Sequence, residues 1–304
     1  MKLIKRLIAK QQGSTLILFS LAMLGMMAIA GLAIDGGTLY EKRAALQKAA
    51  DAAVLSGAQE LTNSQTNVEQ VVNKILVAHG DQNDMKSLDI VMNDKVSIVL
   101  QQIVPLSFFP IFGKDTGTVK VKSTATMGVM GRAIGAAPLG IDESVHLVYN
   151  KEYQLKVDQT LEEVGNFGVL ALGGEGASTY YHNLRYGYDG ELKIGDVIET
   201  QTGNISGKTK QAVQELIEAC PYPEGDYEER DCPRVILIPI YKPYNDVVNQ
   251  MKEVQITGFA YFYITSPVDS HDKTVNGIFI KRVGKGFINS QGSDHGAYAI
   301  RLTE

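Results

Sequence analysis

The chain has 304 residues, of which 44% are hydrophobic and 21% are charged. This is an ordinary globular composition, and it excludes a wholly disordered or collagen-like chain. The net charge is −5, and four basic side chains lie near the start of the sequence, at Lys2, Lys5, Arg6 and Lys10. The rest of the chain therefore carries a net charge more negative than −5. Because an acidic protein binds a phosphate backbone poorly, we predict no nucleic-acid partner. Two cysteines are too few for a disulfide-dense scaffold or a four-cysteine zinc site.

An apolar segment follows the basic tail. It runs from Ser14 to Ile34 and contains no charged residue. As an α-helix rising ~1.5 Å per residue it would measure about 32 Å, enough to cross a hydrocarbon core of ~30 Å. The excess positive charge lies on its N-terminal side. We therefore predict that residues 1–13 form a cytoplasmic basic tail, that residues 14–34 form a single transmembrane helix, and that the remaining chain lies outside the cytoplasm.

Two kinds of proteolytic processing compete with an uncleaved anchor. The sequence Ala-Ile-Ala at 28–30 matches the small-residue pattern of a signal-peptide cleavage site. Cleavage after Gly13 would be of the prepilin type, although type IV pilin precursors usually carry Glu where this chain has Leu18. We favour the uncleaved anchor because the apolar segment continues to Ile34, which a signal peptide does not need.

The segment after the apolar run is rich in alanine and contains no proline, which favours a continuing helix. We predict one helix from about Ser14 to Leu61, with residues 35–62 as an Ala-rich stalk and Gly36-Gly37 as a hinge. Small side chains on one face of this stalk allow close approach of another element. The stalk either packs on its own domain or binds a partner, including a second copy in a helix-mediated oligomer.

Residues 13–61 resemble the N-terminal segment of TadG-like proteins of the tight-adherence (Flp pilus) system. The shared pattern is a short basic tail, a glycine, an apolar span ending in Gly-Leu-Ala-hydrophobic-Asp, an aromatic residue, a basic pair and an Ala-rich stretch. The residues that carry it here are Gly31, Leu32, Ala33, Asp35, Tyr40, Arg43, Leu46, Gln47, Ala49, Ala50, Asp51, Ala52 and Ala53.

The resemblance implies a membrane-anchored, surface-facing component of pilus assembly or adhesion in a bacterial cell membrane. It implies a structural or interaction role, no cofactor, and partners that are the lipid bilayer and envelope or pilus-apparatus proteins. Some members of this family carry a von Willebrand type A domain. This sequence has no Asp-x-Ser-x-Ser motif, so we do not expect the metal-dependent adhesion site of that domain.

The length allows roughly two modest domains of ~100–150 residues. We predict an α+β fold with a small exported α+β unit at 63–131, a Pro- and Gly-containing linker at 132–140, and a β-rich exported domain at 141–304. For the last domain we expect a barrel or roll.

Local patterns predict the elements of these units. Residues 67–80 have the apolar periodicity of a helix, Asn93-Asp94 fits a hairpin turn, and residues 118–130 alternate as a strand. In the β-rich domain we predict a helix at 209–219 and strands at 155–157, 169–172, 192–200, 235–241, 254–265 and 275–283.

Cys220 follows that last predicted helix and Cys232 precedes a strand, with an acidic insert between them. Outside the reducing cytosol this pair can oxidise, and closing such a loop is worth roughly 3 kcal/mol in the chain-entropy model. We predict a disulfide, with two reduced cysteines as the alternative. A zinc site is disfavoured because neither residue lies in a CxxC pair.

No catalytic motif is present in the sequence, so we predict that the chain is not an enzyme, with no catalytic, cofactor-binding or metal-binding residues. A secreted or surface hydrolase with a spatially assembled site is one alternative. Its candidate residues, chosen by proximity in sequence alone, are Ser178 with His182, or Ser293 with Asp294 and His295. The other alternative is a minor pilin-like subunit whose long helix joins a filament.

Overall fold

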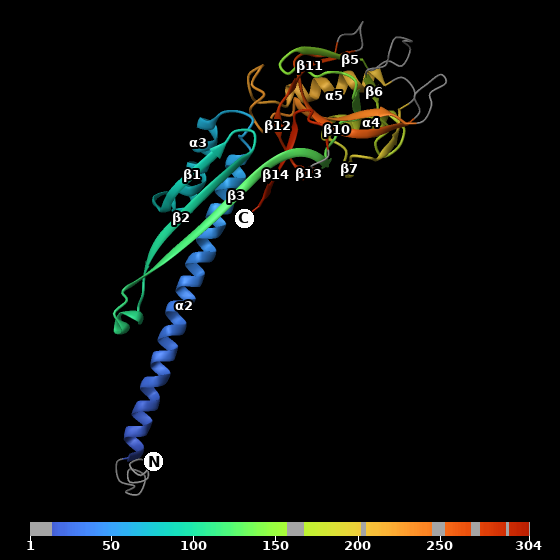
Figure 1. Ribbon diagram of the computed structural model, residues 1–304. Helices are drawn as coiled ribbons and strands as arrows, with labels where there is room; N and C mark the ends of the chain where they lie inside the picture. Colours follow the sequence, from blue (N-terminus) through green and yellow to red (C-terminus); the bar gives the residue numbers. More distant parts are fainter. Residues whose placement is uncertain are drawn as a thin grey trace.

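The computed structural model describes residues 14–156, 167–201, 205–244, 253–268, 274–289 and 292–303. The predicted basic tail at 1–13 lies outside the described residues. The fold is mixed α+β, with a long apolar N-terminal helix, further helices and a strand-rich C-terminal region (Figure 1). The predicted fold class is confirmed.

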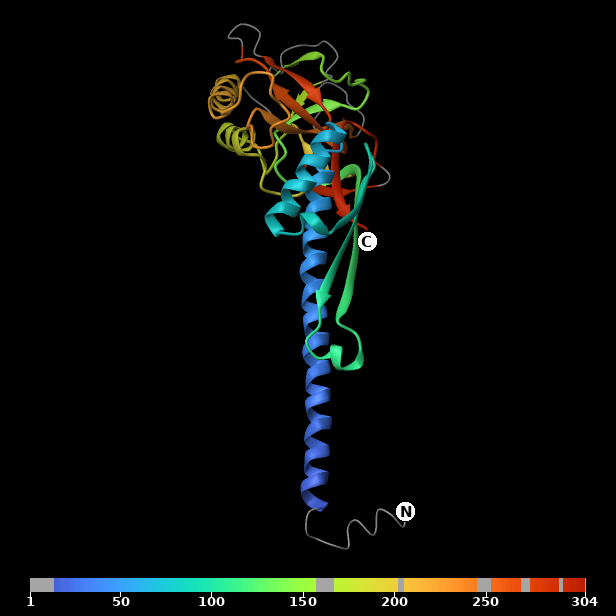
Figure 2. The same ribbon diagram turned by 90° about the vertical axis from the view of Figure 1, so that its left-hand side faces the viewer.

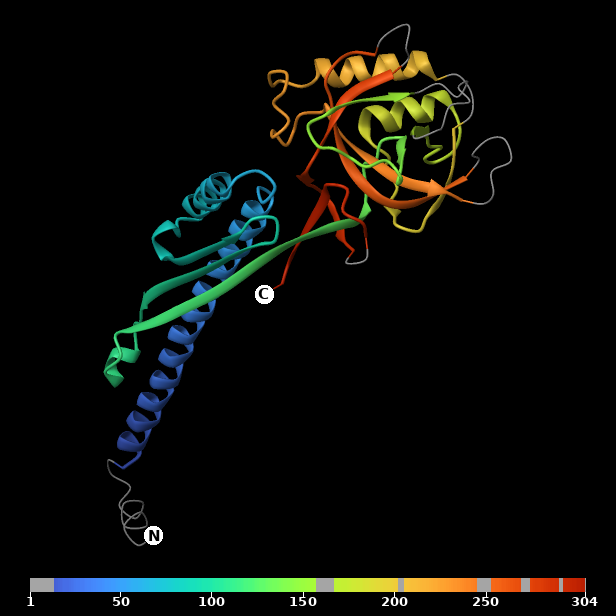
Figure 3. The same ribbon diagram turned by 45° about the horizontal axis from the view of Figure 1, so that its top comes forward.

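Helix α2 (Ser14–Ala58) is the longest element. Its N-terminal half projects away from the rest of the protein in each view (Figures 1, 2 and 3). The helix passes through Gly36 and Gly37 without a break, so the hinge expected there is absent from this structure. A Cβ at either glycine would meet no atom within 4 Å, so packing does not require glycine at these positions.

The C-terminal half of α2 and helix α3 (Gln65–His79) pack against the first sheet. Ser64 caps α3 by accepting the Asn67 N–H, and Gly80 ends it in the left-handed region at φ 79°. The sheet order is β1 (Met85–Val91), β2 (Lys95–Pro105), β3 (Thr116–Ala133), β14 (Ala297–Leu302) and β12 (Arg282–Val283). The short strands β7 (Leu192–Lys193) and β13 (Gly286–Ile288) also pair with β3.

Two short 3₁₀ helices connect elements of this sheet. The first, η1 (Gln82–Asp84), leads into β1, and η2 (Phe109–Phe112) lies in the long connection between β2 and β3. β1 and β2 form the predicted antiparallel hairpin, with Asn93 in the turn at φ 61°. β2 and β3 are antiparallel from Lys95↔Thr126 to Pro105↔Thr116, which makes a second, much longer hairpin.

The Ala-rich part of α2 is buried within its own domain. The side chains of this face are at most 1% exposed and pack with α3, β2 and β3; they are Leu46, Ala49, Ala50, Ala53 and Val54. Small side chains bring the helix backbone close to the sheet, as expected for a face of alanines. Of the two alternatives for the stalk, the structure shows the first, packing on its own domain.

The second sheet curls into a half-barrel in the C-terminal region (Figure 3). Its order is β5 (Glu152–Lys156), β11 (Thr274–Ile280), β10 (Glu253–Ile264), β9 (Val235–Pro243), β4 (Leu139–Asp142) and β6 (Phe167–Val169), and β8 (Val197–Glu199) pairs with β10. Helices α4 (Ala177–Tyr186) and α5 (Ser206–Glu218) share its core through Leu184, Val213 and Leu216.

The two sheets are connected along the chain, and strand pairing and a shared hydrophobic cluster also hold the two regions together. β3 extends through residues 132 and 133, where we expected the linker to begin. The last strand, β14, returns to pair with β3, with Tyr298 opposite Val129. A hydrophobic cluster that includes Met130 and Ala299 from the first sheet and Leu237 from the second fills the junction.

Candidate membrane-anchoring site

The N-terminal half of α2 is apolar and almost unsupported by the rest of the protein. In the described part of the chain, α2 is the one helix long and apolar enough to cross a membrane, and only 6% of its most apolar window is buried. Leu16 is 75% exposed and Phe19 is 65% exposed. An exposed apolar surface of this size indicates an interaction site rather than a water-facing one. The helix fits a single-pass membrane anchor.

Asp35, directly after the apolar segment, binds the far end of the long β2–β3 hairpin. Its side chain is 1% exposed. One carboxylate oxygen accepts the backbone N–H of Ser107 at 2.8 Å, and the other accepts those of Phe108 and Phe109, each also at 2.8 Å. We call this set of three hydrogen bonds the Asp35 clasp, and residues 106–113 of the hairpin the tip.

The clasp determines the protonation state of Asp35. Burial raises the pKa of this carboxyl, but the hydrogen bonds from Ser107, Phe109 and Phe108 outweigh burial and leave the pKa below its ordinary value of 3.8. Asp35 is therefore ionised at neutral pH. A buried carboxylate is stabilised here by three backbone N–H groups, which carry partial positive charge.

Two glycines allow the tip and α2 to come into contact. A Cβ at Gly31, one helical turn before Asp35, would lie 2.6 Å from ring atoms of Phe108. A Cβ at Gly117 in β3 would lie 2.7 Å from Cδ2 of Leu39, one turn after Asp35. Gly31, Asp35 and Leu39 thus present one face of α2 to the hairpin, and Figure 2 shows the hairpin running beside the helix.

This geometry belongs to the part of the chain that matches a known family. Residues 13–60 match the Tad family model, "Putative Flp pilus-assembly TadE/G-like". The resemblance predicted from the sequence is confirmed for this N-terminal segment. No curated protein and no solved structure matches the chain. The Tad segment contains the apolar helix, Asp35 and the Ala-rich stalk, whereas the residues that bind Asp35 lie outside it.

The last residue of the Tad segment is bound by the C-terminal region. Arg230 forms an ion pair with Glu60, with Nε 3.0 Å from Oε1, and donates to the backbone carbonyls of Gln59 and Val283. Arg282 donates to the carbonyls of Tyr227 at 2.9 Å and Glu229 at 3.1 Å. Both guanidinium groups therefore hold chain segments together.

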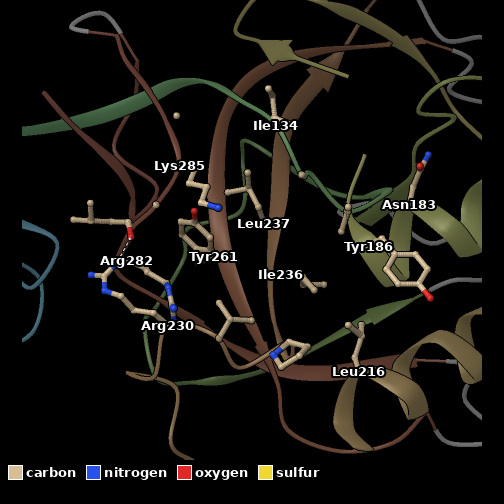
Figure 4. A pocket seen from close by; sticks show the side chains of 18 of the residues that line it. Ile134, Asn183, Tyr186, Leu216, Arg230, Ile236, Leu237, Tyr261, Arg282 and Lys285 are labelled. Atoms are coloured by element: carbon tan, nitrogen blue, oxygen red, sulfur yellow. Dashed lines mark hydrogen bonds between the residues drawn. The ribbon is translucent and has the colours of Figure 1, made fainter. Parts of the chain in front are cut away.

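A cavity of about 830 Å³ lies beside these arginines (Figure 4). Its wall includes Leu216, Ile236 and Tyr261 from the C-terminal region and Gln59 from the Tad segment. The labelled side chains around it are of mixed character, with the two arginines and Lys285 on one side. The cavity therefore lies where Gln59, just after the end of α2, meets the C-terminal region.

The predicted disulfide is present. Cys220 and Cys232 are bonded, with their Cα atoms 4.9 Å apart. Cys232 is buried and packs with Tyr263 and Ile280. The bond closes the acidic insert that carries Arg230, so it restrains the segment that reaches the Tad segment.

The structure gives the contacts of several residues named for a hydrolase. Asp294 accepts the Gly296 N–H at 3.0 Å and the Tyr298 hydroxyl at 2.9 Å. His295 is partly buried, and burial lowers its pKa. In the described part of the chain neither Ser178 nor Ser293 is hydrogen-bonded to a histidine, and no group of His, Cys, Asp and Glu side chains could hold a metal ion.

Proposed function

We propose that this chain is a single-pass, membrane-anchored component of Flp pilus assembly or adhesion, which acts through protein contacts rather than catalysis. The observation that carries the proposal is the apolar half of α2, which leaves the folded body with its large side chains exposed. The Tad family match supports a pilus-assembly role for the same residues. The partners we propose are the lipid bilayer and envelope or pilus-apparatus proteins.

We place the N-terminus in the cytoplasm and the body outside it. The basic residues before Ser14 favour this orientation, because Lys and Arg near a transmembrane helix concentrate on its cytoplasmic side. The Cys220–Cys232 disulfide also supports it, because such bonds persist outside the reducing cytosol.

Thiol alkylation in intact cells tests the anchor and the orientation together. We expect the full chain in the membrane fraction after alkaline extraction, with Cys220 and Cys232 resisting maleimide until a reductant is added. The control is the chain with residues 14–34 deleted, which we expect to stay in the cytosol and react without reductant. Recovery of the uncleaved chain as a soluble cytosolic protein would refute the proposal.

The mass of the mature chain separates the anchor from the two processing routes. An unshortened chain supports the anchor, loss of residues 1–13 supports a minor pilin-like subunit, and loss of residues 1–30 supports secretion. Proximity crosslinking in cells tests the partners: we expect envelope or pilus-apparatus proteins, and their absence from the crosslinked set would overturn the pilus-related role.

A further inference from the structure

The tip of the long hairpin exposes apolar side chains. Ile111 is 79% exposed, Phe112 is 62% exposed and Phe108 is 36% exposed. Phe109 and Phe112 pack edge to face, with ring centroids 6.3 Å apart, within η2. The tip therefore presents an apolar surface with no counterpart in the described part of the chain to cover it.

The tip lies at the level where the apolar segment of α2 ends. Phe108 packs against Gly31, which is three residues before the end of that segment at Ile34, or about 4.5 Å along the helix. The clasp at Asp35 fixes the loop at this height. In Figures 1 and 2 the hairpin runs beside α2 in the direction of the helix N-terminus, and its tip lies beside the middle part of the helix.

Six backbone N–H groups of the tip donate hydrogen bonds within the protein. Ser107, Phe108 and Phe109 donate to Asp35. The other donors described are Leu106 to the carbonyl of Asp115, Ile111 to that of Phe108, and Gly113 to that of Pro110. Pro110 has no N–H. Unpaired backbone polar groups are costly in a nonpolar phase, and the clasp removes that cost for three N–H groups of the tip.

We propose that the tip is a second membrane contact, inserted at the outer boundary of the bilayer beside α2, with Phe108, Ile111 and Phe112 among the acyl chains. This rests on the proposed function, because it requires α2 to span the membrane. Lipid is the occupant because the surface of the tip continues the exposed apolar surface of α2 at the same level. Asp35 is the positioning residue that pairs the backbone of the tip and fixes its depth.

The test uses the full chain in vesicles of phosphatidylethanolamine and phosphatidylglycerol. Single cysteines introduced as Ile111→Cys, Leu24→Cys or Val77→Cys each carry an NBD fluorophore, and the native cysteines are protected in their disulfide. Leu24 lies within the apolar helix, and Val77 is an exposed apolar residue on α3 in the body. Lipids with a nitroxide near the headgroup or deep in the chain report depth, and iodide reports contact with water.

We expect the label at Ile111 to emit at shorter wavelength than the label at Val77 and to be quenched most by the shallow nitroxide. The label at Leu24 should be quenched most by the deep nitroxide. If Leu24 is quenched by lipid and Ile111 by iodide alone, the second contact is refuted and the anchor stands. Protection of Ile111 from both quenchers means that protein covers the tip, which also refutes it. A Leu24 label open to iodide overturns the anchor itself.

Discussion

Asp35 is the residue on which the contact between the hairpin and the apolar helix depends. Its two oxygens accept three backbone N–H groups in the loop, and no lysine or arginine is needed for charge balance because the donors are themselves polar. An asparagine has the same shape, but its amide nitrogen would face an N–H donor. The loop therefore needs two acceptor oxygens at this position, which a carboxylate supplies and an amide does not.

Asp35→Asn should release the tip while the rest of the fold persists. The substitution leaves at least one buried N–H of the loop without an acceptor, which is costly. We expect the label at Ile111 to lose its preference for the shallow nitroxide and the midpoint of thermal unfolding to fall. Asp89→Asn, on the exposed side of β1, is the matched control. Equal behaviour of the two variants would contradict a role for the clasp.

Acid should have the same effect on the native chain. Since the pKa of Asp35 is lowered in the folded state, the clasp contributes its full stability above the ordinary pKa of 3.8 and loses it as the pH falls through the lower folded value. A titration of the Ile111 label in vesicles should show a transition below pH 3.8, absent from Asp35→Asn. A transition of equal size in both chains would assign it to another group.

At the scale of elements, glycines in α2 serve different purposes. Gly31 admits Phe108, whereas Gly36 faces open space. Gly36→Ala should stabilise the helix by about 1 kcal/mol, because alanine has the higher helix propensity. Gly31→Ala should instead displace the tip. Thermal unfolding in detergent measures the first effect and the Ile111 label the second. An unaltered label in Gly31→Ala would show that the contact tolerates a methyl group.

Elements with a strong local pattern could be predicted from the sequence. α3 has apolar side chains at helical spacing, a serine cap and a terminal glycine, and the hairpin at Asn93 has a turn residue that tolerates positive φ. α4 was not predicted because few of its residues are strong helix formers. Tertiary contacts stabilise it instead, including the Tyr180–Thr209 hydroxyl pair at 3.0 Å and the bond from Asn183 to the Leu172 carbonyl at 2.7 Å.

The candidate site could be predicted only in part. The apolar segment and its limit at Asp35 are visible in the sequence. The partners of Asp35 are backbone N–H groups 72 to 74 residues later, and backbone groups leave no mark in the side-chain pattern. The sequence features that could have indicated this contact are a lone acidic residue at the end of an apolar helix and, later, an apolar loop between two strands.

At the scale of the whole molecule, Arg230 helps to set the angle between the stalk and the half-barrel. Arg230→Met removes its bonds to Glu60 and Gln59 and leaves the β3–β14 pairing intact. We expect a broader distribution of distances between spin labels at Val77→Cys and Val148→Cys, measured by pulsed electron resonance. Lys285→Met, at the same cavity, is the control. An unchanged width in Arg230→Met would mean that strand pairing alone sets the angle.

The return of β14 to β3 has a consequence for biogenesis. Between Ala133 and Ala297 the chain builds the whole half-barrel before the strand that completes the first sheet is available. Until β14 emerges, the edge of β3 that will pair with it has unpaired backbone N–H and C=O groups. Such an edge can pair with strands of other chains. A chain truncated before the final strand would leave this edge of β3 permanently open to association with neighbouring chains.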